Sequence, residues 1–190
     1  MSASGGDRSP STGRLGIYFL LAALVMLFGS SIVGYLVIRS RATVWPPPGM
    51  PGLPRGMWVS TAIILASSAT IEHARSAIRH GAWKASGTGM AVTFLLGLAF
   101  LANQTVNWLG PVAAQIAAKP NVYTFGFFVL TGLHAAHVIG GLIPLGIVTA
   151  RARAGRYTAE SHEGADFVAL YWHFLTIIWV VLFAVLLITE

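Results

Sequence analysis

Five long apolar runs, separated by short polar segments, constrain this chain more than any other feature of its sequence. A helix needs about 20 residues to cross a hydrocarbon core ~30 Å thick, because each residue adds ~1.5 Å. Each run reaches that length before a charged or proline-containing segment ends it. We therefore expect an all-α integral membrane bundle of five transmembrane helices, at about residues 15–38, 56–78, 87–108, 122–150 and 165–189.

The composition supports a membrane environment. Only 9% of the 190 residues are charged and 55% are hydrophobic, whereas a soluble domain has about 25% charged residues. The chain has no cysteine, which excludes disulfides, iron–sulfur clusters and thiolate metal sites. The net charge of +6 is typical of a membrane protein that retains Lys and Arg in its cytoplasmic loops, so we expect no nucleic-acid partner.

The chain divides into a polar tail, residues 1–14, which we expect to be disordered, and a transmembrane domain, residues 15–190. Lys and Arg are unequally shared between the two membrane sides, which predicts a cytoplasmic N-terminus and an outward proline-rich loop and C-terminus in a bacterial cell membrane. The inner set is Arg8, Arg14, Arg75, Arg79, Lys84, Arg151, Arg153 and Arg156, and the outer set is Arg39, Arg41, Arg55 and Lys119.

Three histidines fall inside the predicted helices, where polar groups are costly and therefore informative. His134 and His137 are three residues apart and share a helix face, a spacing that could hold a metal or offer axial haem ligands. The alternative is structural, with each ring bonded across helices to hydroxyl or backbone groups. A metal site needs further ligands, and His173 is the remaining candidate, so we expect no metal.

The second predicted helix carries charged residues near its inner end. Arg75 follows Glu72 by three residues, a spacing that places the two side chains together on one face of a helix. We interpret them as an ion pair at the level of the membrane surface. A carboxylate that relays protons is the alternative interpretation.

Four stretches together resemble subunit III of the cytochrome c oxidase and quinol oxidase family. Trp45-Pro46-Pro47-Pro48-Gly49 resembles the family's WPP-G loop, and residues 60–70 resemble the helix that follows it. Residues 127–138, FFVLTGLHAAHV, are similar to its FF-(V/A)-TG-HGLHV motif, and Tyr171-Trp172-His173-Phe174 with Trp179 resembles YWHF-x-x-x-x-W. Their order and spacing agree over nearly the whole chain beyond the tail.

The resemblance implies the five-helix form of a non-catalytic subunit, which lacks the first two helices of the seven-helix form. Haem and copper would then belong to subunits I and II. This chain would pack on subunit I, stabilise it, support its proton uptake and bind phospholipid. The family usually has a buried glutamate where this chain has Leu24. The resemblance also implies structural roles for the motif residues Trp45, Pro46, Pro47, His134, His137, Tyr171, Trp172 and His173.

Three other functions stay open at this level. The chain could be the related accessory subunit of a nitric oxide reductase, which shares these motifs. It could also be a stand-alone membrane haem or metal protein that uses the three histidines, or a small transporter. Co-purification with a large haem protein is expected for an oxidase subunit and for a reductase subunit, but not for a stand-alone protein or a transporter.

Overall fold

The computed structural model of the chain describes residues 12–50, 52–110, 121–155 and 163–189. These residues form five helices and no strand, which confirms the all-α prediction. Most of the predicted tail lies outside the described residues, but helix α1 begins at Thr12, slightly before the predicted boundary. The helices are α1 (Thr12–Arg41), α2 (Gly56–Arg79), α3 (Trp83–Leu109), α5 (Val122–Arg153) and α6 (Glu163–Thr189).

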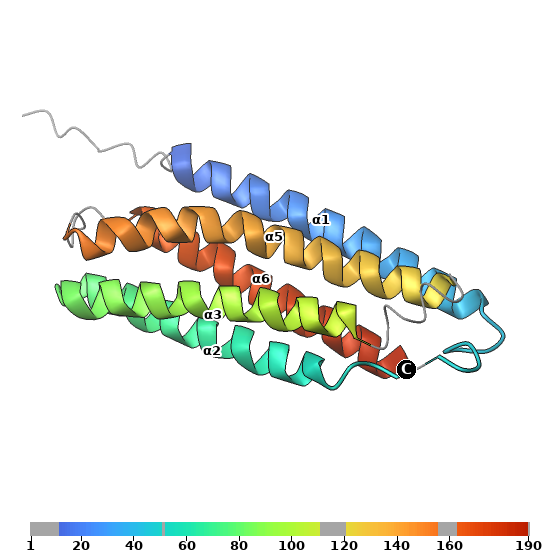
Figure 1. The fold of residues 1–190 in the computed structure, drawn as a ribbon. Helices are drawn as coiled ribbons and strands as arrows, with labels where there is room; N and C mark the ends of the chain where they lie inside the picture. The colour runs from blue at the N-terminus through green and yellow to red at the C-terminus, as the bar shows by residue number, and fades with distance from the viewer. Residues whose placement is uncertain (1–11, 51, 111–120, 156–162, 190) are drawn as a thin grey trace, which may run out of the picture.

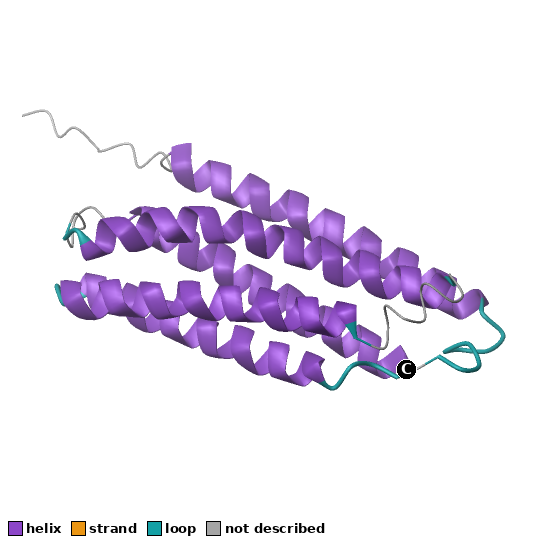
Figure 2. Cartoon of the chain, viewed as in Figure 1, coloured by secondary structure: helices purple, strands orange, loops and turns teal. Residues whose placement is uncertain are grey.

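The helices run roughly along one axis, with α1 and α2 at opposite edges of the bundle (Figure 1). Helix α2 packs most extensively on α3 and also on α6, whereas α1 packs mainly on α6 and α5. A turn of residues 80–82 joins α2 to α3 (Figure 2). Gly81 takes a φ of 72° there, a conformation that glycine adopts without steric cost. α2 and α3 therefore form a tight antiparallel hairpin.

Four helices, α1, α3, α5 and α6, are long and apolar enough to cross a membrane. Helix α2 has 24 residues, about 36 Å of helix, so it is long enough but is not apolar enough by the same measure. The prediction of five apolar spans therefore holds for four of the described helices. The polar side chains that lower the hydropathy of α2 include Ser60, Ser67, Ser68, Glu72 and Arg75.

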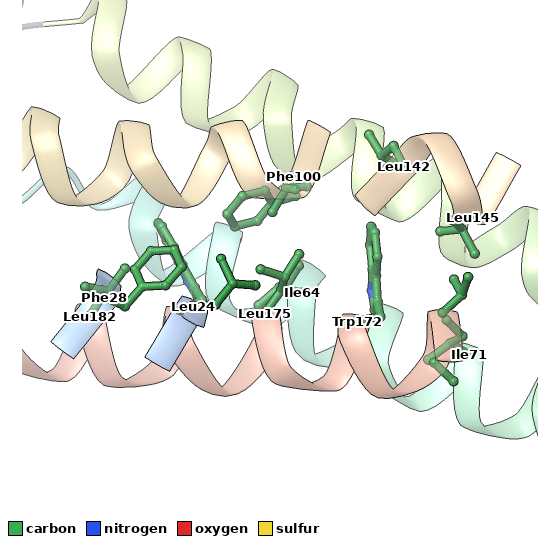
Figure 3. Close-up of a cluster of buried hydrophobic side chains, with 14 of the residues drawn as sticks. Leu24, Phe28, Ile64, Ile71, Phe100, Leu142, Leu145, Trp172, Leu175 and Leu182 are labelled. Atoms are coloured by element: carbon green, nitrogen blue, oxygen red, sulfur yellow. The ribbon is translucent and has the colours of Figure 1, made fainter. Parts of the chain in front are cut away.

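The core lies where α1, α2, α3, α5 and α6 meet. Figure 3 shows part of it as one continuous apolar cluster, with side chains from all five helices. Trp172 and Trp179 of α6 are the largest fully buried side chains. Gly97 of α3 makes room for the first of them, because a Cβ at Gly97 would lie 2.8 Å from Trp172 Cη2.

The loop between α1 and α2 is anchored on the bundle by Trp45. Its ring packs edge-on against Tyr35 of α1 and Tyr123 of α5, with ring centroids 5.7 and 5.2 Å apart. Pro46 and Pro47 follow it and are half-buried. This part of the proline-rich loop is therefore held against one end of the bundle, on the side where α6 ends (Figure 1).

Candidate functional site

His173 of α6 contacts polar side chains through both of its ring nitrogens. Its Nδ1 lies 2.6 Å from Ser68 Oγ, and its Nε2 lies 3.1 Å from Glu72 Oε2. Both partners belong to α2. An ionised carboxylate only accepts hydrogen bonds, so Nε2 carries the hydrogen, and in the neutral ring Nδ1 accepts from the Ser68 hydroxyl. The two contacts therefore select one tautomer of the ring.

Glu72 extends this contact into a network of both charge signs. Its Oε1 accepts a hydrogen bond of 2.8 Å from Arg75, so the predicted Glu72–Arg75 ion pair is present. Asp166 of α6 lies 3.5 Å from Arg75 and 3.1 Å from Arg79. The network thus links α2 to α6 by two charged contacts besides the histidine, which the sequence spacing alone did not predict.

The Tyr171-Trp172-His173 motif makes a separate hydrogen bond through each of its three side chains. Trp172 Nε1 donates to Ser67 Oγ at 2.9 Å, next to the serine that holds His173. Tyr171 Oη donates to the backbone oxygen of His137 on α5 at 3.2 Å. The motif therefore fixes α6 against α2 on one side and against α5 on the other.

Trp179, seven residues after Trp172, also donates a hydrogen bond from its indole to a hydroxyl group of α2. Trp179 Nε1 donates to Thr61 Oγ1 of α2 at 3.0 Å. Buried indole N–H groups generally need such a partner. The hydroxyl partners Thr61, Ser67 and Ser68 all lie in residues 60–70, the stretch that resembles the family's next helix, but the sequence did not predict their bonds to α6.

His134 lies in an aromatic enclosure at the centre of the bundle. Its side chain is fully buried, with ring centroids 5.0 Å from Trp179, 5.6 Å from Phe100 and 6.3 Å from Phe28. Neither ring nitrogen has a hydrogen-bond partner among the described residues. The expectation that His134 bonds across helices is therefore wrong, because the side chains that surround it are aromatic.

His137 also differs from the expected cross-helix pattern. Its Nδ1 contacts the backbone oxygen of Leu133 in its own helix at 2.7 Å. Its ring lies 5.1 Å from Phe28, which also contacts His134, so the two histidines do share a helix face. The bond within the helix orients the ring but does not tie α5 to a neighbour.

The three histidines lie in different surroundings. No group of three or more His, Asp or Glu side chains in the described parts of the chain is arranged to hold a metal ion. Aromatic rings enclose His134, and protein groups already contact both ring nitrogens of His173.

Comparison with known proteins agrees with the motifs. The family model of cytochrome c oxidase subunit III matches residues 14–189. Cytochrome c oxidase subunit 3 of Thermostichus vulcanus is 31% identical over 178 residues, which cover 93% of this chain and 87% of that protein. The protein of the same name from Synechocystis sp. is 33% identical over 183 residues, 95% of this chain and 77% of its own length.

A third relative comes from a different bacterial group. The probable cytochrome c oxidase subunit 3 of Nocardia farcinica is 31% identical over 177 residues, which cover 92% of this chain and 87% of that protein. All three alignments extend over nearly the whole length of this chain, so they include its loops as well as its helices. This chain therefore belongs to the cytochrome c oxidase subunit III family.

Proposed function

We propose that this chain is the non-catalytic subunit III of a haem-copper terminal oxidase in a bacterial cell membrane. The observation that carries the proposal is the family match over residues 14–189. In this role the chain packs on subunit I, stabilises it and supports proton uptake from the cytoplasm, while subunits I and II hold the haem and copper. Bound phospholipid would complete its surface.

The arrangement of the histidines supports a structural role within the oxidase. His173 is committed to Ser68 and Glu72, and His134 is enclosed by rings. A redox centre would need ligands with supporting groups around them. The motif residues instead hold α2, α5 and α6 together, which suits a subunit whose task is to present a rigid surface to its partner.

We further propose that α2 is the fifth transmembrane span and that the N-terminus faces the cytoplasm. Helix α2 is the shortest of the described helices, but its 24 residues still exceed the ~20 needed for a span. Its polar side chains bond to α3 and α6 at several positions. The excess of Lys and Arg on one set of connections supports the orientation. The proline-rich loop would then face outward.

The experiment is purification of the tagged full-length chain from its native membrane in mild detergent. We expect it to carry haem and copper in a fixed ratio to subunit I, with oxygen reduction by the complex. Removal of the chain should leave an oxidase that loses activity faster during turnover. A tagged chain that recovers no haem protein contradicts the proposal. A partner that reduces nitric oxide rather than oxygen would assign the chain to a reductase instead.

A further inference from the structure

A surface pocket of about 440 Å³ lies between α3 and α5, at the end of the bundle where α3 begins and α5 ends (Figure 1). It is lined by Lys84, Gly87, Thr88, Ala152, Arg153 and Gly155. Lys84 and Arg153 are both exposed, and no acidic side chain lines the pocket. The pocket is separate from the contact of His173 with Glu72, which joins α6 to α2.

Gly87 allows Arg153 to lie against α3. A Cβ at Gly87 would lie 3.2 Å from Arg153 Cγ and 3.4 Å from Arg153 Cα. The last turn of α5 therefore packs directly on the first turns of α3. This packing brings the guanidinium of Arg153 and the ammonium of Lys84 to one pocket, although the two residues come from distant parts of the chain.

The two basic side chains of the pocket have no carboxylate partner among the described residues. The acidic side chains of the described residues are Glu72, Glu163 and Asp166, and each forms an ion pair with an arginine of α1 or α2. The negative charge of the described chain is thus used on the other side of this end of the bundle. Two unpaired cations around one pocket attract an anion.

The first turn of α3 adds hydrogen-bond donors next to these cations. No side chain caps it, and an uncapped first turn leaves backbone N–H groups without a partner in the helix. Ser86, beside Gly87, is 1% exposed, and its Oγ has no hydrogen-bond partner among the described residues. The end of α5 carries the opposite partial charge to the start of α3, so the two cations decide that the pocket favours an anion.

The pocket lies at the level where two candidate membrane spans end. The span of α3 begins at Lys84, and the span of α5 ends at Arg153, so both cations lie at the boundary of the hydrocarbon core. Val92 and Leu95 follow Thr88 by four and seven residues, which places all three on one face of α3. They are 39% and 62% exposed. An apolar surface therefore runs from the pocket toward the middle of the membrane.

Resting on the membrane placement in the proposed function, we infer that this pocket binds the phosphate group of an anionic phospholipid such as phosphatidylglycerol. Lys84 and Arg153 contact the phosphate, and an acyl chain lies along Val92 and Leu95. A zwitterionic lipid fits less well, because its own cation offsets the charge that the two side chains attract. Inorganic phosphate shares the charge but has no chain for the apolar face of α3.

Lipid retention by the purified full-length chain tests this site. The chain in detergent is incubated with equal amounts of phosphatidylglycerol and phosphatidylcholine, washed, and its retained lipids are quantified by mass spectrometry. Lys84→Gln combined with Arg153→Gln should lower the excess of phosphatidylglycerol by at least ~5-fold, the factor that one basic side chain contributes. Arg41→Gln combined with Arg55→Gln removes the same charge away from the pocket and should leave the excess within about twofold.

Equal retention by the two double variants, both shown to be folded by circular dichroism, overturns the inference. Displacement of the lipid by excess inorganic phosphate would assign the pocket to a soluble anion and overturns it as well. Haem recovered with the tagged chain is measured separately. Its absence contradicts the proposed oxidase subunit, whereas lipid retention reports on the pocket alone, so the two failures are distinguishable.

Photo-crosslinking in vesicles gives a second readout that depends on position. A photoreactive amino acid replaces Thr88, which lines the pocket, or Thr105 as the matched control. Both threonines are exposed residues of α3, and each donates to the backbone oxygen four residues earlier. In vesicles of equal phosphatidylglycerol and phosphatidylcholine, we expect at least ~5-fold more phosphatidylglycerol adduct at Thr88 and a ratio near one at Thr105. A ratio near one at Thr88 overturns the inference.

Discussion

His173 of α6 contacts Glu72 of α2, with 3.1 Å between Nε2 and Oε2. The histidine belongs to the Tyr171-Trp172-His173 motif, whereas the glutamate lies in the one helix that is not apolar enough to qualify as a membrane span. The contact explains why both can be present: each supplies the hydrogen-bonding partner that hydrocarbon would deny to the other.

A double-mutant cycle should measure this contact. Glu72→Gln and His173→Gln should each lower the free energy of unfolding, and their effects should be coupled by about 0.5–1 kcal/mol, because both side chains are partly exposed. Unfolding of the purified chain by a denaturing detergent provides the measurement. Strictly additive effects would show that the two side chains do not interact.

His134 and His173 should respond differently when each is replaced by leucine. His134→Leu should change the free energy of unfolding by less than ~1 kcal/mol, because neither ring nitrogen has a hydrogen-bond partner among the described residues and the surroundings are apolar. His173→Leu should cost roughly 1–3 kcal/mol, since it leaves Ser68 and Glu72 without their partner. A larger cost at His134 than at His173 would contradict this assignment of roles.

Gly97 should not tolerate a methyl group. The Cβ of Gly97→Ala would lie 2.8 Å from Trp172 Cη2 and 2.9 Å from Leu142 Cδ2, so we expect a loss of about 1–3 kcal/mol in the free energy of unfolding. Gly29→Ala is the matched control, because no atom lies within 4 Å of a Cβ built there. Equal stability of the two variants would show that α3 and α6 are packed less closely than described.

Leu24→Glu should not restore a proton-handling site. Leu24 is buried in the core beside Phe28, so an unpaired carboxyl there should cost ~3 kcal/mol of unfolding free energy. Leu24→Met, which nearly conserves volume, should cost less than ~1.5 kcal/mol. Pumped protons per electron should not rise in the variant oxidase; a clear rise would identify a proton route through this position.

The orientation can be tested with one cysteine, since the chain has none of its own. A membrane-impermeant thiol reagent should label Gly52→Cys in intact cells, because the positive-inside rule places the proline-rich loop outside. A cysteine at His80, in the turn between α2 and α3, should be labelled only after the cells are opened. The reverse pattern would invert the proposed topology.

The sequence by itself determined the number of helices and their approximate limits. Apolar runs of membrane length, ended by Arg39 or Arg151, need no tertiary contact to be recognised, because lipid requires each span to satisfy its own backbone hydrogen bonds. The Glu72–Arg75 pair was also predictable, since helical geometry alone brings residues three apart together. The same local information identified the motifs that led to the family.

Only the tertiary structure decided which polar groups meet. Ser68 and His173 are 105 residues apart in the chain, and no periodicity within either helix specifies that they face each other. His134 and His137 looked equivalent in sequence, yet one is enclosed by the rings of three other helices and the other bonds to its own helix. The physical reason is that helix rotation and partner choice depend on how residues such as Trp172 and Gly97 pack against each other across the whole bundle.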